Sequence, residues 1–255
     1  MTRNSHDVSN LAKALGLTLA AFLASAFLAS ASSAAAAVLI DLNDGDNSSI
    51  NTTSAAAAAA DFEAALGLTS GALSGETVLL FNNNGEAVAS GTTQTVGGVT
   101  VDLPAAAFGN EADGFFPRAD NPMLSDGVFL DPNESGEIEL SGVGLNPNTA
   151  YEITLFAIRA GGHDTTFTFD PANPSDPSNG TSINLTATSG ETNAAATFSF
   201  TTGASTPASL NIDWESGNQS GEFGILTGIA LIPEPASAAL VALGTLSLLP
   251  RRRRG

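Results

Sequence analysis

The chain has 255 residues, no cysteine, and 26 acidic against 8 basic residues, which gives a formal net charge of −18. This acidity argues against nucleic acid and anionic membrane surfaces as partners of the folded part, because both repel negative charge. The lack of cysteine excludes disulfides, so a stable domain must rely on its hydrophobic core.

Residues 1–37 are predicted to form an export signal peptide. Basic residues lie near the start, residues 14–28 are almost purely apolar, and the small residues that follow offer several A-x-A-like cleavage points. We therefore expect signal peptidase to cut between Ala31 and Ala37, so that the mature chain begins near Val38.

The first expected strand, 38–42, runs into a segment that is rich in short oxygen ligands. This segment resembles a calcium-binding loop, with a glycine among Asp41, Asn43, Asp44 and Asp46. Counted from Asp41, the glycine is fifth and position twelve is Thr52, whereas an EF-hand places glycine sixth and an acidic residue twelfth. Calcium is therefore one possible cofactor, and a solvated turn after the strand is the alternative.

One helix is predicted at Ala55–Leu66. Ser54 can cap its start, Gly67 stands just beyond its end, and Phe62 with Leu66 gives it a narrow apolar stripe. We expect this helix to cover one end of the surrounding β-structure.

The remainder of the segment 38–232 alternates short apolar stretches with turn residues, which is typical of an all-β fold. Gly97 and Gly98 should form a two-residue hairpin turn. Alternation with a period of two predicts a shared core for Ile138 and Leu140, Phe167 and Phe169, Ile183 and Leu185, Phe198 and Phe200, and Leu210, Ile212 and Trp214. The expected strands are 38–42, 77–81, 87–90, 93–96, 99–103, 128–130, 137–141, 151–159, 165–169, 182–187, 195–201, 209–214 and 225–232.

The longest irregular stretch, 105–125, contains the adjacent rings of Phe115 and Phe116 next to Arg118. These three residues are a candidate ligand patch, because sugar rings stack on aromatic side chains. The alternative is a loop plug that fills the edge of the core.

The start of strand 151–159 carries the best indication of the fold. Leu145, Pro147, Thr149 and Tyr151 follow the L-x-P-x-T-x-Y pattern of a fibronectin type III domain, in which a tyrosine corner locks the crossing between two sheets. Five expected strands follow instead of one, so we expect a two-sheet jelly roll. The strand order over residues 128–232 resembles galactose-binding-like and carbohydrate-binding jelly rolls.

No catalytic constellation is evident, and the chain is predicted not to be an enzyme. His163 and Asp164 lie in a Gly-Gly-His-Asp sequence that should be a turn, and no G-x-S-x-G elbow marks a nucleophile. Glu137 and Glu139 share one strand face, which suits an exposed polar face better than the two opposed acids of a glycosidase. An extracellular hydrolase remains the less favoured alternative.

Residues 233–255 form a three-part tail: Pro233, Glu234 and Pro235, an apolar run over 236–249, and Arg251, Arg252, Arg253 and Arg254. This order resembles the PEP-CTERM sorting signal, which an exosortase recognises and cuts. The run is shorter than the roughly 20 residues that span a bilayer, and the arginines should stay on the cytoplasmic side. The alternative is a permanent single-pass anchor.

The sequence thus predicts a signal peptide (1–37), one acidic β-sandwich domain (38–232) and a sorting signal (233–255). Of the 8 basic residues only Arg118 and Arg159 fall within the domain, against 24 of the 26 acidic ones, so its net charge is −22. We expect an exported protein, anchored in the membrane at least transiently, at the cell surface or in an exopolysaccharide matrix. Its expected role is structural or adhesive, with a carbohydrate-binding module that binds polysaccharide as the alternative. Signal peptidase and exosortase are the expected processing partners.

Overall fold

The structure is a computed structural model of the whole chain. It describes residues 36–44, 54–83, 92–104, 127–157, 163–187, 195–219 and 222–234. The chain divides into two units, Met1–Ala35 and Ala36–Gly255, and all described residues belong to the second. Within the described ranges no helix is long and apolar enough to span a bilayer. The expected leader before Ala36, the strand 87–90 and the apolar run 236–249 lie outside these ranges.

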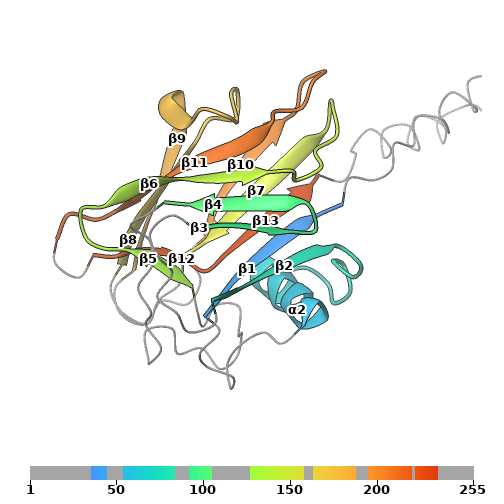
Figure 1. Ribbon diagram of the computed structural model, residues 1–255, viewed down its shortest axis with the longest axis horizontal. Coiled ribbons are helices and arrows are strands. Elements are labelled where there is room, and N and C mark those ends of the chain that lie inside the picture. Colours follow the sequence, from blue (N-terminus) through green and yellow to red (C-terminus); the bar gives the residue numbers. More distant parts are fainter. Residues whose placement is uncertain are drawn as a thin grey trace, which may run out of the picture. The chain divides into compact units, whose positions relative to one another are not determined.

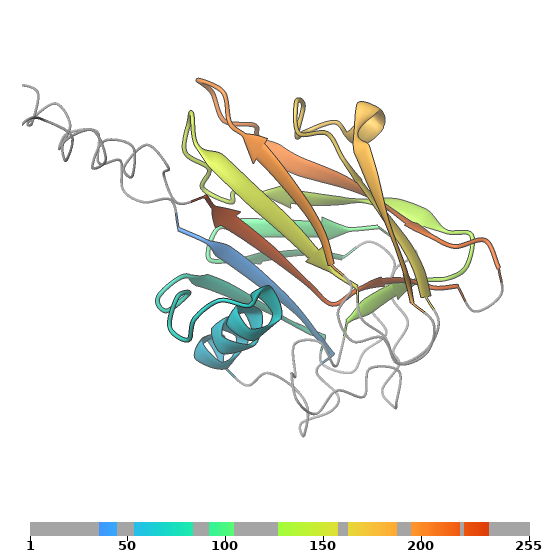
Figure 2. The same ribbon diagram turned by 180° about the vertical axis from the view of Figure 1, so that it is seen from behind.

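Two β-sheets form a sandwich, as the sequence predicted (Figures 1 and 2). Sheet A has the order β10 (Ala195–Thr201), β7 (Ala150–Phe156), β13 (Gly228–Pro233), β1 (Val38–Asp44) and β2 (Thr77–Asn83). Sheet B has the order β3 (Thr92–Val96), β4 (Val99–Leu103), β6 (Ser135–Ser141), β11 (Ser209–Ser216), β8 (His163–Phe169) and β9 (Thr181–Ala187). A small third sheet pairs β12 (Gly224–Leu226) with β5 (Val128–Leu130).

Eight of these strands have the topology of a jelly roll. Along the chain, β1, β6, β7 and β8 alternate between the sheets, β8 pairs with β9, and β10, β11 and β13 alternate again. The result is two four-stranded antiparallel sheets, β10-β7-β13-β1 and β6-β11-β8-β9. Strand β2 lies parallel to β1 at one edge, and the hairpin β3–β4 extends the other sheet. Gly97 and Gly98 form its turn, with φ of 61° and 90°, as expected.

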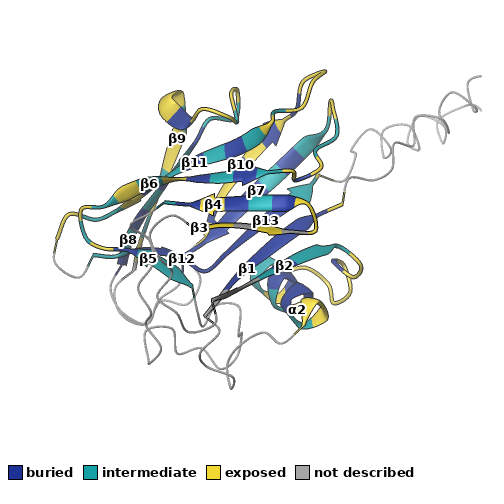
Figure 3. Ribbon diagram, in the orientation of Figure 1, coloured by how far each residue is buried: buried dark blue, intermediate teal, exposed yellow. Residues whose placement is uncertain are grey.

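The core between the sheets comes from the alternating side chains that the sequence predicted. Ile138, Leu140, Phe167, Phe169, Leu210, Ile212 and Trp214 are all fully buried, and Phe198 and Phe200 are 4 % exposed. Aromatic rings link the two sheets, because Phe169 of β8 packs against Phe198 and Phe200 of β10 with centroids 5.6 and 5.5 Å apart. Ile183 and Leu185 are only half-buried, since β9 is an edge strand (Figure 3).

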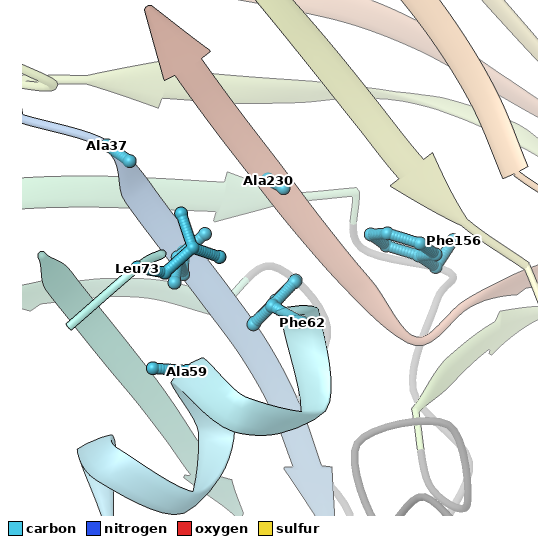
Figure 4. Packing of buried hydrophobic residues seen from close by; sticks show 7 residues of the cluster. Ala37, Ala59, Phe62, Leu73, Phe156 and Ala230 are labelled. Atoms are coloured by element: carbon cyan, nitrogen blue, oxygen red, sulfur yellow. The ribbon is translucent and has the colours of Figure 1, made fainter. Parts of the chain in front are cut away.

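Helix α2 (Ala55–Leu66) forms where the sequence predicted it. The Ser54 side chain accepts a hydrogen bond from the Ala57 N–H, and Gly67 ends the helix in the left-handed conformation at φ 67°. The expectation that it covers one end of the sandwich is wrong, because it packs on the outer face of sheet A, over β1 and β2. Figure 4 shows Phe62 of this helix beside β1. The Phe62 ring packs edge to face against that of Phe156, at the end of β7. Their ring centroids are 5.8 Å apart.

A buried carboxylate fastens this helix to the loop that follows it. Glu63 is 5 % exposed, and its two oxygens accept the backbone N–H groups of Gly71 and Leu73, each at 2.7 Å. Leu73 in turn packs into the apolar cluster beneath the helix. The helix and the loop are therefore positioned as one unit.

The expected tyrosine corner is present. The hydroxyl of Tyr151, at the start of β7, accepts a hydrogen bond from the Asn146 N–H at 2.8 Å, and its ring stacks on Phe200 at 5.5 Å. The bond closes the turn through which the chain passes from β6 in sheet B to β7 in sheet A. The fibronectin-like stretch therefore forms a tyrosine corner here as well, but in a sandwich with jelly-roll topology.

The expected single strand 225–232 is two strands that belong to different sheets. The chain breaks at Thr227, which is fully buried: its N–H donates to the Phe156 carbonyl at 2.8 Å, and its own carbonyl accepts from the Leu42 N–H at 3.3 Å. Before this residue the chain pairs with β5, and after it with β7 and β1. The apolar sequence continues through the break, so the alternation gave no sign of it.

Tyr151→Phe tests the tyrosine corner. The change leaves the Asn146 N–H without its acceptor, so we expect the free energy of unfolding to fall by about 1–2 kcal/mol in urea denaturation. Thr149→Ala is the control, because it removes only an exposed hydroxyl bond to the Pro147 carbonyl and should cost about 0.5 kcal/mol or less. Equal losses in the two variants would contradict a locking role for the tyrosine.

Glu63→Gln tests the fastening of the helix. A glutamine has one acceptor oxygen, so one of the two backbone N–H groups loses its partner, and we expect a loss of about 1–3 kcal/mol in the same measurement. Ala64→Gln, at the neighbouring exposed position, should change stability by about 0.5 kcal/mol or less. A Glu63→Gln protein as stable as the native one would show that the carboxylate is not needed.

Candidate functional site

The outer face of sheet B is a polar surface that several described strands build together. In β6 and β11, residues such as Ile138 and Trp214 point into the core, so the residues next to them in sequence point outward. Strand pairing places these outward residues side by side. Three rows result: Asp102, Glu139 and Asn211; Glu137, Asp213, Thr168 and Ser182; Glu215, Thr166 and Asn184. We call these ten residues the polar face.

The side chains of the polar face bond to one another across the strands. Asn211 donates to Glu137 at 2.8 Å, and the hydroxyls of Thr168 and Ser182 are 2.8 Å apart. Asn184 donates to Thr166 at 2.8 Å and also to Asp164. These bonds connect neighbouring strands and hold the carboxamides in fixed orientations, and the face carries no aromatic ring.

Among the described residues no α-helix lies over the polar face, and the short 3-10 helix at Pro177–Asn179 contacts β8 and β11. On the outer face of sheet A, in contrast, α2 lies over β1 and β2, and the strand residues below it are apolar. Figure 3 shows β1 and β13 buried along most of their length. The polar face thus remains accessible, and Glu137 and Glu139 lie on it as an exposed and a half-buried carboxylate, which confirms the expected exposed strand face.

One carboxylate of the polar face, that of Asp213, is destabilised in its ionised form. Burial raises the pKa of Asp213 above its ordinary value, and the nearby negative charge of Asp176 adds to the increase. The pKa of Asp176 is itself lowered, because its carboxylate accepts hydrogen bonds from the side chain and backbone of Ser178. No lysine or arginine occurs among the described residues, so none of them can neutralise this face.

The sandwich end at β5 and β12 offers a second feature, a pair of aromatic rings. Phe129 and Phe223 meet edge to face with centroids 5.5 Å apart, and both are half-buried. They are the only aromatic rings among the described side chains that are not buried. The sequence gave no reason to select them, because they lie in two short segments that only the fold brings together.

His163 does not lie in a turn, as the sequence suggested. It is the first residue of β8, is 4 % exposed, and is bridged to Phe223 through the backbone. Asp164, the next residue, points to the outer face and is bonded to Asn184. The strand alternation therefore separates the two side chains, which argues against a catalytic pair.

The expected calcium ligands are described only in part. Asp41 is fully buried within β1, so it does not belong to a solvated turn, and the strand continues through Asn43 to Asp44, whose side chains are not described. Asp46 lies outside the described residues. Within the described part of the chain no three histidine, aspartate or glutamate side chains gather in a way that could hold a metal ion.

The remaining predicted site residues fall at or beyond the edges of the described ranges. Phe115, Phe116 and Arg118 lie outside them, as do Pro235 and Arg251, Arg252, Arg253 and Arg254. Pro233 is the last residue of β13, and the Glu234 N–H donates to the Ala150 carbonyl at 2.9 Å. The first two residues of the Pro-Glu-Pro triplet are thus part of the folded domain.

Comparisons with solved structures return mainly carbohydrate-binding modules. A "Family 16 Carbohydrate Binding Module-2" is 20 % identical, with 59 % of this chain and 97 % of that chain covered and a TM-score of 0.27. A family 29 module from Piromyces equi is 12 % identical (57 % and 88 % covered, TM-score 0.29). TmCBM61, solved with β-1,4-galactotriose, is 15 % identical (59 % and 92 % covered, TM-score 0.28).

These similarities are too low to carry an argument about this chain. No protein-family model matches the sequence, and no curated protein matches it. The jelly-roll assignment therefore rests on the strand order, and the site must be judged from its own residues.

Asp213→Asn tests the cost of burying the Asp213 carboxylate near the charge of Asp176. A raised pKa in the folded state means that ionised Asp213 destabilises the protein at neutral pH, and that stability is gained as the pH falls through that pKa. We therefore expect the variant to raise Tm by about 1–2 °C at pH 7, with a smaller difference toward pH 4. Glu139→Gln on the same face is the control for loss of one charge, and no gain at pH 7 from Asp213→Asn would contradict the assignment.

Proposed function

We propose that this protein is an exported, non-catalytic adhesive component of the cell surface or exopolysaccharide matrix, which binds polysaccharide through the polar face. The observation that carries the proposal is the polar face itself, where carboxylates, carboxamides and hydroxyls stand in register on an uncovered sheet. Such groups hydrogen-bond sugar hydroxyls, and those of the polar face are already oriented by bonds between strands, which lowers the entropy cost of binding. The half-buried pair of Phe129 and Phe223 offers the aromatic surface that sugar rings favour.

The charge of the domain restricts the kind of polysaccharide. A face with five carboxylates and no described basic residue repels an anionic chain, so the favoured ligand is a neutral polysaccharide. Binding of an anionic polymer would need a divalent cation between the two surfaces. Whether the bound polysaccharide is neutral or anionic therefore tests this charge argument.

The sorting signal supplies the location. Only Pro235 separates Glu234, which is bonded to β7, from the expected apolar run 236–249. While that run is inserted, the sandwich end that holds Ala150 stays close to the membrane. Exosortase cleavage after the triplet would then release the domain into the matrix, whereas a permanent anchor would keep it at the surface.

Absence of catalysis is part of the proposal. It is supported by the burial of His163 at the start of β8 and by the spread of the carboxylates over three rows of sheet B. A hydrolase would need two acids on opposite sides of a scissile bond. Release of reducing ends from a bound polysaccharide would overturn this part.

Pull-down with insoluble polysaccharides tests the binding. We expect the native protein to sediment with at least one neutral polymer, and the double variant Asn184→Ala, Asn211→Ala to lose at least tenfold in affinity, because both carboxamides lie on the polar face. The control is Thr197→Ala with Ser199→Ala, two exposed positions on the outer face of sheet A, which should bind like the native protein.

The outcomes separate the alternatives. Equal binding by both double variants would place the ligand elsewhere, and the variant Phe115→Ala with Phe116→Ala would then test the predicted loop patch. No binding to any polymer would leave a purely structural role. Intact-mass measurement of secreted and membrane fractions tests the sorting, because a chain that ends near Pro235 indicates cleavage, whereas a retained arginine tail indicates an anchor.

A further inference from the structure

The domain begins at Ala37, and its backbone nitrogen faces a carboxylate. The Ala37 N–H donates to Glu76 Oε2 at 2.7 Å, and the Ala37 carbonyl accepts from the Thr77 N–H at 3.1 Å. Its methyl group is 2 % exposed and belongs to the cluster under α2, which also contains Phe62 (Figure 4). Ala36, in contrast, is exposed. Among the described residues, Ala37 is therefore the first on which the fold depends.

The leader offers several small-residue cleavage points that the sequence does not distinguish, but the structure does. A cut after Ala37 would remove a residue that both holds β2 and fills the cluster, whereas a cut before Ala36 would leave an exposed extension without a structural role. A cut between Ala36 and Ala37 follows the A-x-A pattern, with Ala34 and Ala36 at the two small positions. It places the new N-terminus at the nitrogen that already bonds to Glu76.

We propose that signal peptidase cuts between Ala36 and Ala37, and that Glu76 binds the α-ammonium group this cut creates. The inference rests on the export proposed above. It adds a processing site and an ion pair that exists only in the mature protein, since the precursor has an uncharged amide at this position. Maturation would thus place a positive charge on the donor of a hydrogen bond whose acceptor is already an ionised carboxylate, and so convert that bond into an ion pair.

The surroundings favour a positive charge at this position. Apart from the Tyr151 hydroxyl on β7, the titratable groups on the elements around Ala37 are carboxylates: Asp41 and Asp44 on β1, Asp61 and Glu63 on α2, Glu76 before β2, Glu152 on β7 and Glu234 after β13. The bond from Ala37 to Glu76 is partly buried, and Ala36, which the cut removes from this nitrogen, is exposed. Desolvation therefore opposes the pair only weakly.

The composition of the mature chain makes this pair unusually easy to detect. Lys13 is the only lysine of the protein and lies in the leader, and cysteine is absent, so the α-amine is the sole primary amine after processing. An α-amino group ordinarily has a pKa of about 7.7–8.0, which the facing carboxylate should raise. The stability that the pair contributes is then fully present below pH 7.5 and is lost as the pH rises through the raised value.

Mass spectrometry of the secreted full-length gene product tests the cleavage site. We expect the mature N-terminal peptide to begin at Ala37. A start at another residue of the small-residue segment would overturn this inference and leave export intact, whereas an uncut chain that begins at Met1 would overturn both. The two failures are therefore distinguishable.

Thermal unfolding between pH 7 and pH 9.5 tests the ion pair in the same secreted protein. We expect the Tm of the native protein to fall by about 2–4 °C more than that of Glu76→Gln over this range. Tyr151, the other group that ionises at alkaline pH, is present in both proteins and cancels. Glu222→Gln is the matched control, because its carboxylate also accepts a backbone N–H, that of Gln219 at 2.8 Å, and should follow the native protein. Parallel curves for native and Glu76→Gln would overturn the pair.

A measurement without substitution covers the case in which Glu76→Gln does not fold. Reductive ¹³C-methylation of the lysine-free mature protein labels the α-amine alone, and its NMR shift followed against pH reports the pKa directly. A value above about 8.5 supports the pair, and a value in the ordinary range of about 7.7–8.0 overturns it.

Discussion

Strand β1 is buried on both faces, and the rest of the fold depends on this arrangement. Val38, Ile40 and Leu42 point into the sandwich core, while Ala37 and Leu39 lie beneath α2. A strand covered on one face only would leave apolar residues in water at about 25 cal/mol per Å². The helix, its fastening by Glu63 and the parallel pairing of β2 therefore serve one purpose, which is to complete the outer cover of sheet A.

This requirement divides the surface of the molecule into two kinds. Helix α2 covers part of the outer face of sheet A, over β1 and β2, and this part of the sheet is therefore not exposed. In the described part of the chain sheet B has no such α-helical cover, and the alternation that fills the core places carboxylates, carboxamides and hydroxyls outside. The polar face follows directly from the need to bury one side of a sheet and to solvate the other. The need for a solvated surface alone explains the polar face, without any ligand. The binding experiment, with its matched control on sheet A, therefore decides whether the ordered side chains also bind polysaccharide.

The sequence predicted those features that short stretches of chain determine. Ser54 and Gly67 set the ends of the helix, Gly97 and Gly98 set a hairpin, and alternation identified the core of β6, β8 and β11. The sequence could not predict what depends on pairing between distant strands. It could not place α2 on a sheet face, because its apolar stripe fits any apolar surface. It also missed the break at Thr227, where backbone partners in β1 and β7 divide a continuous apolar stretch between two sheets.

The candidate site shows the same division. The spacing of Glu137 and Glu139 predicted their exposed strand face, but the register that sets Asp213 between Glu137 and Thr168 is a property of three strands. The sequence likewise could not predict the exact cleavage site, since every alanine near the cleavage region satisfies the same small-residue rule. Burial of one methyl group and one hydrogen bond to Glu76 separate Ala37 from its neighbours. A signal peptidase recognises the small residues of the unfolded leader, whereas the folded domain requires that Ala37 remain. The same alanine segment must therefore satisfy both the peptidase and the fold.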